Sequence, residues 1–314
     1  MENLIFSLNA TVPVFLMMVL GFVLHEIGWM DDEFASKLNR FVFKVPLPVL
    51  LFGDLAMVDF DEVWNMKFVM FCFGATVISI AISTGISFVW KDRSLRGEFI
   101  QASYRSSAAI LGIAFIQNIY GTAGMAPLMI IGSVPLYNVI AVLVLTLFRP
   151  GQNGLNKEVV KRTLKGVVTN PIILGIAAGL CWSLLRLPMP AIPGRLVSEV
   201  AGVTTPLGLM AMGAAFDIHK AFARFKPAAT AAFIKLAGFC ALFLPAAVRL
   251  GFRQEELVAI LVMLGSATTV TCFVMAKNMG HDGTLSSSVV MLTTLFSAFT
   301  LTGWLYVLRS LGLI

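Results

Sequence analysis

The sequence predicts an all-α polytopic membrane protein with ten transmembrane helices, and its composition and hydropathy pattern carry that prediction. Of its 314 residues, 58% are hydrophobic and only 13% are charged, whereas about a quarter of a typical soluble domain is charged. The apolar residues occur in long runs, and a membrane β-barrel would instead show short alternating segments. The formal net charge of +6 is divided among short loops, so no nucleic-acid partner is expected.

The chain contains ten apolar runs of roughly the 20 residues that cross a bilayer as a helix. They cover residues 8–28, 36–57, 67–90, 98–120, 126–148, 164–186, 195–217, 227–249, 254–277 and 284–308. Two of them are interrupted by residues that are uncommon in a membrane helix. Pro46 and Asp54 fall in the second run, and Glu199 and Pro206 fall in the seventh.

The basic residues of the connections are divided unevenly between the two sides of the membrane. Connections that follow odd-numbered spans carry fifteen Lys and Arg residues, and the opposite side carries six. Because cytoplasmic loops are rich in Lys and Arg, the odd-numbered connections are expected in the cytoplasm and both termini outside. The longest connection, residues 149–163, is then a cytoplasmic loop of a multi-pass protein in the cell (inner or plasma) membrane.

The two halves of the chain share a pattern of prolines and glycines. Pro and Gly stand eight residues apart in the first span of each half and seven apart in the second, as Pro13 and Gly21, Pro171 and Gly179, Pro46 and Gly53, and Pro206 and Gly213. With an odd number of spans per half, the second half enters the membrane upside down. We therefore expect a 5+5 inverted repeat, with residues 1–148 as the first unit, 149–163 as the connecting loop and 164–314 as the second unit.

Two polar stretches, Tyr104–Gly121 and Gly265–Gly280, fall in the fourth span of each half. Polar groups in hydrocarbon cost several kcal/mol each unless they find partners. Inverted-repeat transporters use such groups where helices break near the bilayer midplane. We expect helices 4 and 9 to be broken near Ser107 and Thr269, to cross there, and to form a binding site.

Several groups of residues, spread over essentially the whole chain, are similar to those of a known family. They are Leu111-Gly112-Ile113 with Tyr120-Gly121, Asn170-Pro171, Pro206-Leu207 through Gly213, and Phe273 to Lys277 running into Thr293-Thr294. With them the chain resembles the auxin efflux carrier family of the bile/arsenite/riboflavin transporter superfamily, which includes bacterial organic-acid carriers and the plant PIN auxin exporters. The resemblance implies a sodium/proton antiporter-like fold. Helices 1, 2, 6 and 7 would form a scaffold, with a homodimer through helices 2 and 7, and helices 3–5 and 8–10 would form a mobile transport unit.

The chain departs from this family at the two breaks, where other members carry prolines or a Pro-Asn or Gly-Asn step. The departing positions are Ser106, Ser107 and Ala114 in span 4 and Ala267 and Cys272 in span 9. Without proline, each break has to depend on Gly112, on Gly265 and on hydroxyl groups that satisfy the freed backbone.

Nine residues near the expected crossing are candidates for substrate binding. They are Arg105, Ser106, Ser107, Gly112, Gln117, Asn138, Thr268, Thr269 and Thr271. Their hydroxyl and amide groups can replace the water that a carboxylate loses, but they could equally bond to their own helices or pack between helices. The guanidinium of Arg105 either meets an anionic substrate or reaches back to the lipid headgroups. Lys235, which sits at a similar depth, is expected to reach the headgroups.

Asp54 is the candidate for proton coupling, because a carboxylate within a membrane span is costly and usually functional. Its position near the outer interface favours the alternative of a solvated helix end. No metal or cofactor is expected, since His25, His219 and His281 stand far apart without the spacing of metal ligands.

These features favour a secondary transporter of a small organic anion, such as a malate- or malonate-type carboxylate or an auxin-like acid, with elevator-type or rocking movement. The chain has no P-loop, so direct drive by ATP is not expected. The alternative within transporters is a sodium-coupled symporter of the bile-acid type. An intramembrane enzyme would need paired carboxylates, clustered histidines or an activated nucleophile, and a membrane sensor would need an added soluble domain. The coupling ion and the direction of transport stay open.

The charge asymmetry predicts that the loop 149–163 faces the cytoplasm. A cysteine introduced as Asn153→Cys should resist an impermeant thiol reagent in intact cells and react after the cells are opened. Met189→Cys, in a predicted outer loop, is the matched control and should react in intact cells. Equal labelling of the two positions in intact cells would contradict the cytoplasmic location of loop 149–163.

Overall fold

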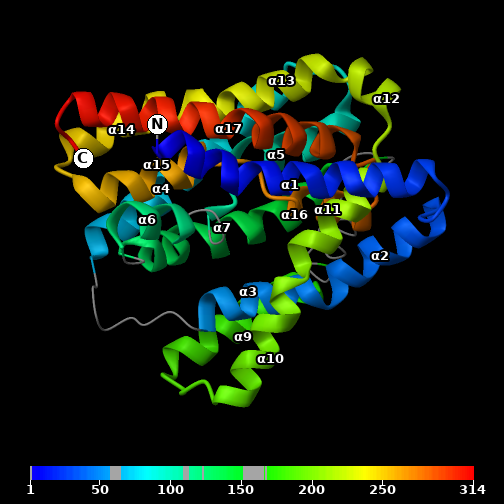
Figure 1. The fold of residues 1–314 in the computed structure, drawn as a ribbon, viewed down its shortest axis with the longest axis horizontal. Coiled ribbons are helices and arrows are strands. Elements are labelled where there is room, and N and C mark those ends of the chain that lie inside the picture. The colour runs from blue at the N-terminus through cyan, green and yellow to red at the C-terminus, as the bar shows by residue number, and fades with distance from the viewer. Residues whose placement is uncertain (1, 57–64, 109–112, 122–123, 151–165, 167) are drawn as a thin grey trace.

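The computed structural model describes residues 2–56, 65–108, 113–121, 124–150, 166 and 168–314, and these residues form helices and connections without a strand (Figure 1). The helices are α1 (Glu2–Glu26), α2 (Asp32–Lys44), α3 (Pro46–Ala56), α4 (Met66–Ser87), α5 (Arg96–Tyr104), α6 (Ile113–Tyr120), α7 (Ala126–Leu147), α9 (Pro171–Leu184), α10 (Ala191–Gly202), α11 (Thr204–Ala214), α12 (Ile218–Ala223), α13 (Phe225–Phe233), α14 (Phe239–Arg249), α15 (Gln254–Gly265), α16 (Thr271–Asn278) and α17 (Thr284–Ser310). A 3-10 turn, Arg93–Leu95, precedes α5, and a π-helical segment, Ile234–Gly238, joins α13 to α14.

Five helical segments within the described residues are long and apolar enough to cross a membrane. They are Met66–Ser87, Ala126–Leu147, Ala191–Ala214, Phe225–Arg249 and Thr284–Ser310, and two shorter apolar helices cover Thr11–Glu26 and Pro171–Leu184. This pattern agrees with the predicted multi-pass membrane protein. The count of ten spans and the 5+5 repeat stay predictions.

Other predicted spans are each divided into two shorter helices. The second consists of α2 and α3, which meet where Val45 precedes Pro46. Proline lacks an N–H and so cannot continue the hydrogen bonds of the preceding helix, and Val45, with φ −122° and ψ −74°, lies outside the regular helical conformation. The fourth span consists of α5 and α6, and the ninth of α15 and α16.

Two pairs of helices touch backbone to backbone through glycines. A Cβ atom on Gly213 of α11 would lie 2.0 Å from the carbonyl oxygen of Met18 on α1, and one on Gly21 of α1 would lie 2.2 Å from the carbonyl oxygen of Met210. In the second pair, a Cβ on Gly179 of α9 would lie 2.7 Å from a backbone carbonyl of α3. Small residues let helices approach closely in a bilayer, where the hydrophobic effect adds little between helices. These glycines therefore fix the α1–α11 and α3–α9 contacts.

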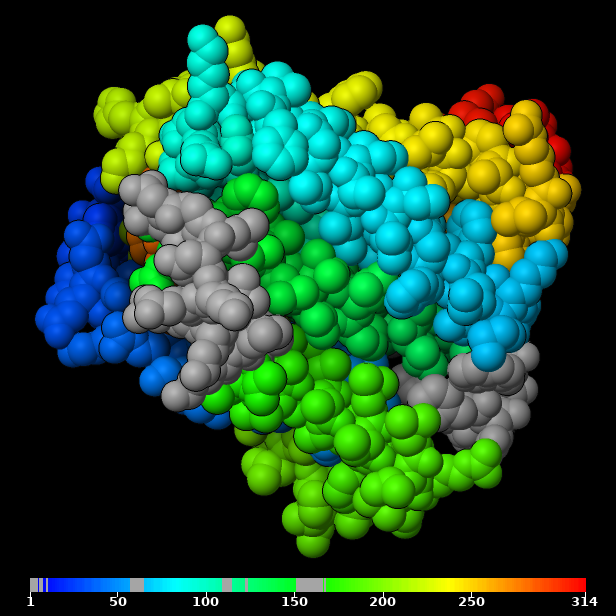
Figure 2. Space-filling model, turned by 180° about the vertical axis from the view of Figure 1, so that it is seen from behind, coloured from blue at the N-terminus to red at the C-terminus, as the bar shows by residue number. Residues whose placement is uncertain are grey.

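Helices α3, α9 and α10 form a lobe that projects from the remaining helices (Figures 1 and 2). α10 has no buried residue, and Ile192 and Leu196 on it are 84% and 62% exposed. An apolar surface of this kind suits lipid or another apolar protein surface.

A buried carboxylate ties α5 to the start of α17. The side chain of Glu98, which is 1% exposed, accepts hydrogen bonds from the backbone N–H groups of Gly283 and Ser286, each at 2.9 Å. The first N–H groups of a helix lack intrahelical partners and carry partial positive charge, so a carboxylate stabilises this end. Both chain termini lie at the opposite end of the molecule, at the left of Figure 1.

Gly213→Ala should separate α1 from α11, because its methyl group would meet backbone that cannot rotate away. We expect a loss of about 1–3 kcal/mol, typical of overpacking, seen as a lower unfolding temperature in detergent. Gly74→Ala on α4 is the matched control: its added methyl has no neighbour within 4 Å, and it should be neutral or stabilising by up to about 1 kcal/mol. Equal shifts in both variants would contradict the packing role of Gly213.

Candidate functional site

The interruptions of the fourth and ninth spans lie against each other. Residues 105–107 between α5 and α6 are non-helical, and so are residues 266–270 between α15 and α16. The backbone N–H of Ser107 donates to the carbonyl of Ala267 at 3.0 Å. The predicted breaks near Ser107 and Thr269 are therefore present, and they meet.

Side chains satisfy backbone groups across this crossing without a proline on either side. The Thr268 hydroxyl donates to the carbonyl of Ala102 at 2.9 Å, and the Gln101 amide donates to the carbonyl of Cys272 at 2.9 Å. The backbone N–H of Thr268 donates to the hydroxyl of Thr293 on α17 at 3.0 Å. Hydroxyls and amides thus provide the internal partners that a bilayer cannot.

The guanidinium of Arg105 lies inside the crossing and is 1% exposed. It donates to Asn138 Oδ1 at 2.6 Å, Thr271 Oγ1 at 2.8 Å and Met275 Sδ at 2.8 Å, and its Cζ lies 5.4 Å from the ring centroid of Tyr137. The alternative that Arg105 reaches the headgroups is therefore wrong. Three candidates from different predicted spans, Arg105, Asn138 and Thr271, come together here.

A second basic side chain, that of Lys235, is fully buried, and it bonds to Ser106, the residue after Arg105. It donates to the carbonyl oxygens of Leu264 at 2.6 Å and Met263 at 3.2 Å, and to the hydroxyl of Ser106. The expectation that Lys235 reaches the headgroups is wrong, because its side chain is buried and bonds to the last turn of α15. The sequence did hold a signal, namely a lysine well inside the apolar segment Phe225–Arg249.

Neither buried cation has a carboxylate partner within the part of the chain that the structure describes. Ion pairs between described residues involve only exposed or partly exposed side chains. The buried carboxylate of Glu98 is used at the start of α17. Arg105 and Lys235 are therefore stabilised by hydroxyl, amide, carbonyl and sulfur atoms, which carry no full negative charge.

A cavity of about 40 Å³ lies where the crossing faces α1 and α11. Six hydroxyl-bearing side chains line it: Thr11, Ser107, Thr205, Thr268, Thr269 and Thr294. The hydroxyl of Thr269 accepts a hydrogen bond from the hydroxyl of Thr271 at 3.2 Å, which links the cavity to Arg105. The predicted Ser107, Thr268 and Thr269 thus share one small polar cavity.

A wider cavity of about 830 Å³ opens at the end of the molecule that holds the loops predicted to be cytoplasmic. Charged and titratable side chains of both signs line it: His25, Glu26, Asp32, Asp217, His219, Lys220 and Lys277. The backbone N–H of Lys220 donates to Asp217 at 3.0 Å and holds the pKa of that carboxyl below its usual value. Ala211 and Phe273, which line this cavity, are close in sequence to Leu209 and Val270, which line the polar cavity.

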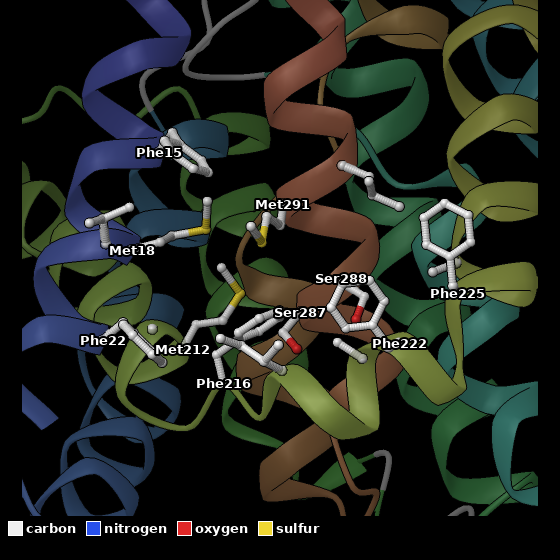
Figure 3. A pocket seen from close by; sticks show the side chains of 16 residues that line it. Phe15, Met18, Phe22, Met212, Phe216, Phe222, Phe225, Ser287, Ser288 and Met291 are labelled. Carbon is white, nitrogen blue, oxygen red and sulfur yellow. The ribbon is translucent and has the colours of Figure 1, made fainter. Parts of the chain in front are cut away.

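An apolar cavity of about 370 Å³ is lined by α1 and α11 on one side and by α12, α13 and α17 on the other (Figure 3). Phenylalanine and methionine side chains dominate its lining, and Phe15 and Phe22 of α1 stand across from Met291 of α17 (Figure 3). Its only hydroxyls among the described residues, those of Ser287 and Ser288, donate to the carbonyl of Thr284. This cavity suits hydrocarbon and offers nothing to a carboxylate.

Two predicted residues lie outside the hydrogen bonds of the crossing, and a third lies outside the described residues. Gln117 lies exposed on α6, and its role in substrate binding stays a prediction. Asp54 is half-buried on α3 and does not line the polar cavity, and its coupling role stays a prediction. Gly112 lies outside the described residues.

Comparison with known proteins gives one family and two relatives. The family model described as membrane transport protein matches residues 6–305. An "Uncharacterized transporter" of Methanothermobacter thermautotrophicus is 22% identical over 313 residues, which cover 96% of this chain and 98% of that protein. A "Putative malonate transporter" of Rhizobium meliloti is 24% identical over 305 residues, which cover 95% and 94%.

Asn138→Leu removes the acceptor of the shortest hydrogen bond of Arg105. Because hydrogen bonds to charged groups contribute about 1.5–3 kcal/mol, the unfolding temperature of the purified protein should fall by several degrees. Gln117→Leu replaces an exposed amide and should change stability by no more than about 0.5 kcal/mol. If Asn138→Leu unfolds at the wild-type temperature, its amide does not hold the guanidinium.

Proposed function

We propose, from the premise that the chain belongs to the membrane transport protein (auxin efflux carrier) family, that it is a secondary transporter of a small organic anion. The family and the transporter relatives make it a membrane transporter and not an enzyme. The observation that carries the substrate class is the presence of two buried cations, Arg105 and Lys235, without a carboxylate partner among the described residues.

The charge balance of the crossing favours an anion over a cation. Burying an ion costs several kcal/mol, and removing solvent strengthens any remaining attraction or repulsion. A carboxylate near Arg105 and Lys235 would offset their charge, whereas a cation there would be repelled. The start of α16 at Thr271 adds the positive end of a helix dipole.

The polar cavity at the crossing is the proposed binding site, and its size implies movement. Ligand pockets usually measure about 300–1,000 Å³, but this cavity measures only about 40 Å³. A carboxylate substrate therefore requires the crossing to move away from α1 and α11. The wider cavity at the predicted cytoplasmic end is lined by residues within one helical turn of residues that line the polar cavity, and this closeness supports elevator-type or rocking movement.

The glycine contacts support the proposed inverted repeat. Exchange of the two halves would replace α1 by α9 and α11 by α3. The α1–α11 pair is then equivalent to the α9–α3 pair, and these are the two pairs that touch through Gly213 and Gly179. On this proposal both pairs belong to the scaffold, and the exposed apolar surface of α10 is available for lipid or for a homodimer through helices 2 and 7.

Among organic anions, we favour a compact carboxylate of the malonate or malate type. The name of the Rhizobium meliloti relative points to malonate for that protein. The hydroxyl-rich cavity suits carboxylate oxygens better than the ring of an indole acid. An auxin-like acid is the alternative, and the uptake and thermal-stability experiments described next distinguish the two.

Ser107→Ala and Thr269→Val should weaken binding and flux of the substrate anion in proteoliposomes. A hydrogen bond to a charged ligand contributes about 1.5–3 kcal/mol, so each change should weaken affinity roughly tenfold to hundredfold. The measurement is uptake of labelled malonate or malate, with indole-3-acetate as the competing aromatic acid. Ligand-induced thermal stabilisation of the purified protein gives the same ranking independently of flux.

Thr84→Val is the matched control for the loss of a hydroxyl. On α4, the Thr84 hydroxyl donates only to its own helix, at the carbonyl of Ile80 at 2.8 Å. It should transport at the wild-type rate. Unchanged affinity in both Ser107→Ala and Thr269→Val, or transport of a cation with exclusion of every carboxylate, would refute the proposed site.

A further inference from the structure

The ammonium group of Lys235 occupies the end of a broken helix. Its partners, the carbonyl oxygens of Met263 and Leu264, belong to the last turn of α15, which ends at Gly265. The last four carbonyls of a helix lack intrahelical donors and carry the negative end of the helix dipole. The hydroxyl of Ser106, from the other interrupted span, is the third partner of the ammonium.

These partners resemble the ligand set by which transporters bind a coupling cation. In transporters with broken helices, unwound carbonyls and the C-terminal ends of half-helices coordinate sodium or a proton. In this protein the amine of Lys235 lies at the C-terminal end of the half-helix α15, next to the crossing. No carboxylate among the described residues pairs with it, so the carbonyl and hydroxyl dipoles alone hold the charge.

The local backbone is built to place this side chain. Lys235 lies in the π-helical segment Ile234–Gly238, and such segments are rare and often occur at functional sites. The indole N–H of Trp304 on α17 donates to the carbonyl of Leu236 at 3.2 Å and steadies the segment. The cavity beside the ammonium measures about 10 Å³, room for no more than about one water molecule.

We propose that Lys235 is a tethered cation that fills the position of a coupling ion at the end of α15, so that the protein works without sodium. The site that it fills would accept a small free cation, such as sodium, potassium or methylammonium, once the lysine is removed. The transport consequence rests on the proposed function, but the cation site itself does not. A single residue, Lys235, would then distinguish this chain from sodium-coupled symporters.

Two substitutions of Lys235 separate a cation site from a merely structural lysine. Lys235→Ala removes the ammonium and also leaves room for a free cation, whereas Lys235→Met removes the charge but keeps the length of the side chain. Thermal unfolding of the purified proteins is compared in choline, sodium, potassium and methylammonium chlorides, without substrate. We expect a small cation to stabilise Lys235→Ala and to leave Lys235→Met and the wild type unchanged.

Flux in proteoliposomes gives the second readout. Wild-type uptake of the carboxylate should be equal in sodium and choline. Lys235→Ala should be about tenfold slower or more in choline, the loss expected for a charged hydrogen-bonded group, and a small cation should restore it severalfold. Lys67→Ala is the matched control, because the exposed Lys67 also donates to a backbone carbonyl, that of Leu250 at 2.5 Å, and it should show no cation dependence.

Three results would overturn the proposal. They are stabilisation or stimulation of the wild type by sodium, a folded Lys235→Ala protein that responds to no cation, and a Lys235→Ala protein that fails to fold in every salt. Folding of Lys235→Ala with sodium or methylammonium but not with choline would support it. Absence of carboxylate transport by the wild type would refute the proposed function, while the thermal comparison would still decide the cation site.

Discussion

The hydrogen-bonded crossing of two interrupted helices is the constraint on which the rest of the molecule depends. A bilayer offers no water to unpaired backbone groups, so an interruption within it must find partners in the protein. Here each interruption supplies the partners of the other, through Ser107 and Ala267, Thr268 and Ala102, and Gln101 and Cys272. If one interruption became regular helix, the backbone groups of the other would lose their hydrogen-bond partners. The two interruptions also bring polar side chains into an otherwise apolar molecule.

The two buried cations follow from this arrangement. Arg105 is the first residue after α5 and Lys235 bonds to the neighbouring Ser106, so both charges gather on the same turn of broken backbone. Neutral dipoles hold both charges, and such dipoles offset the cost of burial less completely than a carboxylate would. The buried carboxylate of Glu98 does not pair with them, because its two oxygens are bound at the start of α17. This excess of positive charge is the feature on which the proposed preference for an anion depends.

The sequence predicted much of this candidate site because polar residues within apolar runs must find hydrogen-bond partners inside the protein. The positions of the breaks and the meeting of Arg105, Asn138 and Thr271 follow from that rule. It failed for Lys235, because depth along a helix does not reveal which way a side chain in a π-helical segment points. The exposure of Gln117 could not be predicted either, because Gln117 lies beyond the break in span 4, where α6 starts a new helix whose rotation cannot be extrapolated from α5.

The contacts of α1 show how rigid and movable interfaces can exist on one helix. Toward α11, α1 is held backbone to backbone at Gly21 and Gly213, and sliding there would drive carbonyl groups into each other. Toward α17, it faces phenylalanine and methionine side chains around an apolar cavity (Figure 3). Such side chains can exchange neighbours without breaking hydrogen bonds, and methionine is especially adaptable. α1 therefore meets α11 through fixed backbone contacts and α17 through adaptable side chains. The movement that we propose for the crossing requires this difference, because the proposed scaffold has to stay intact while its other surface lets the crossing pass.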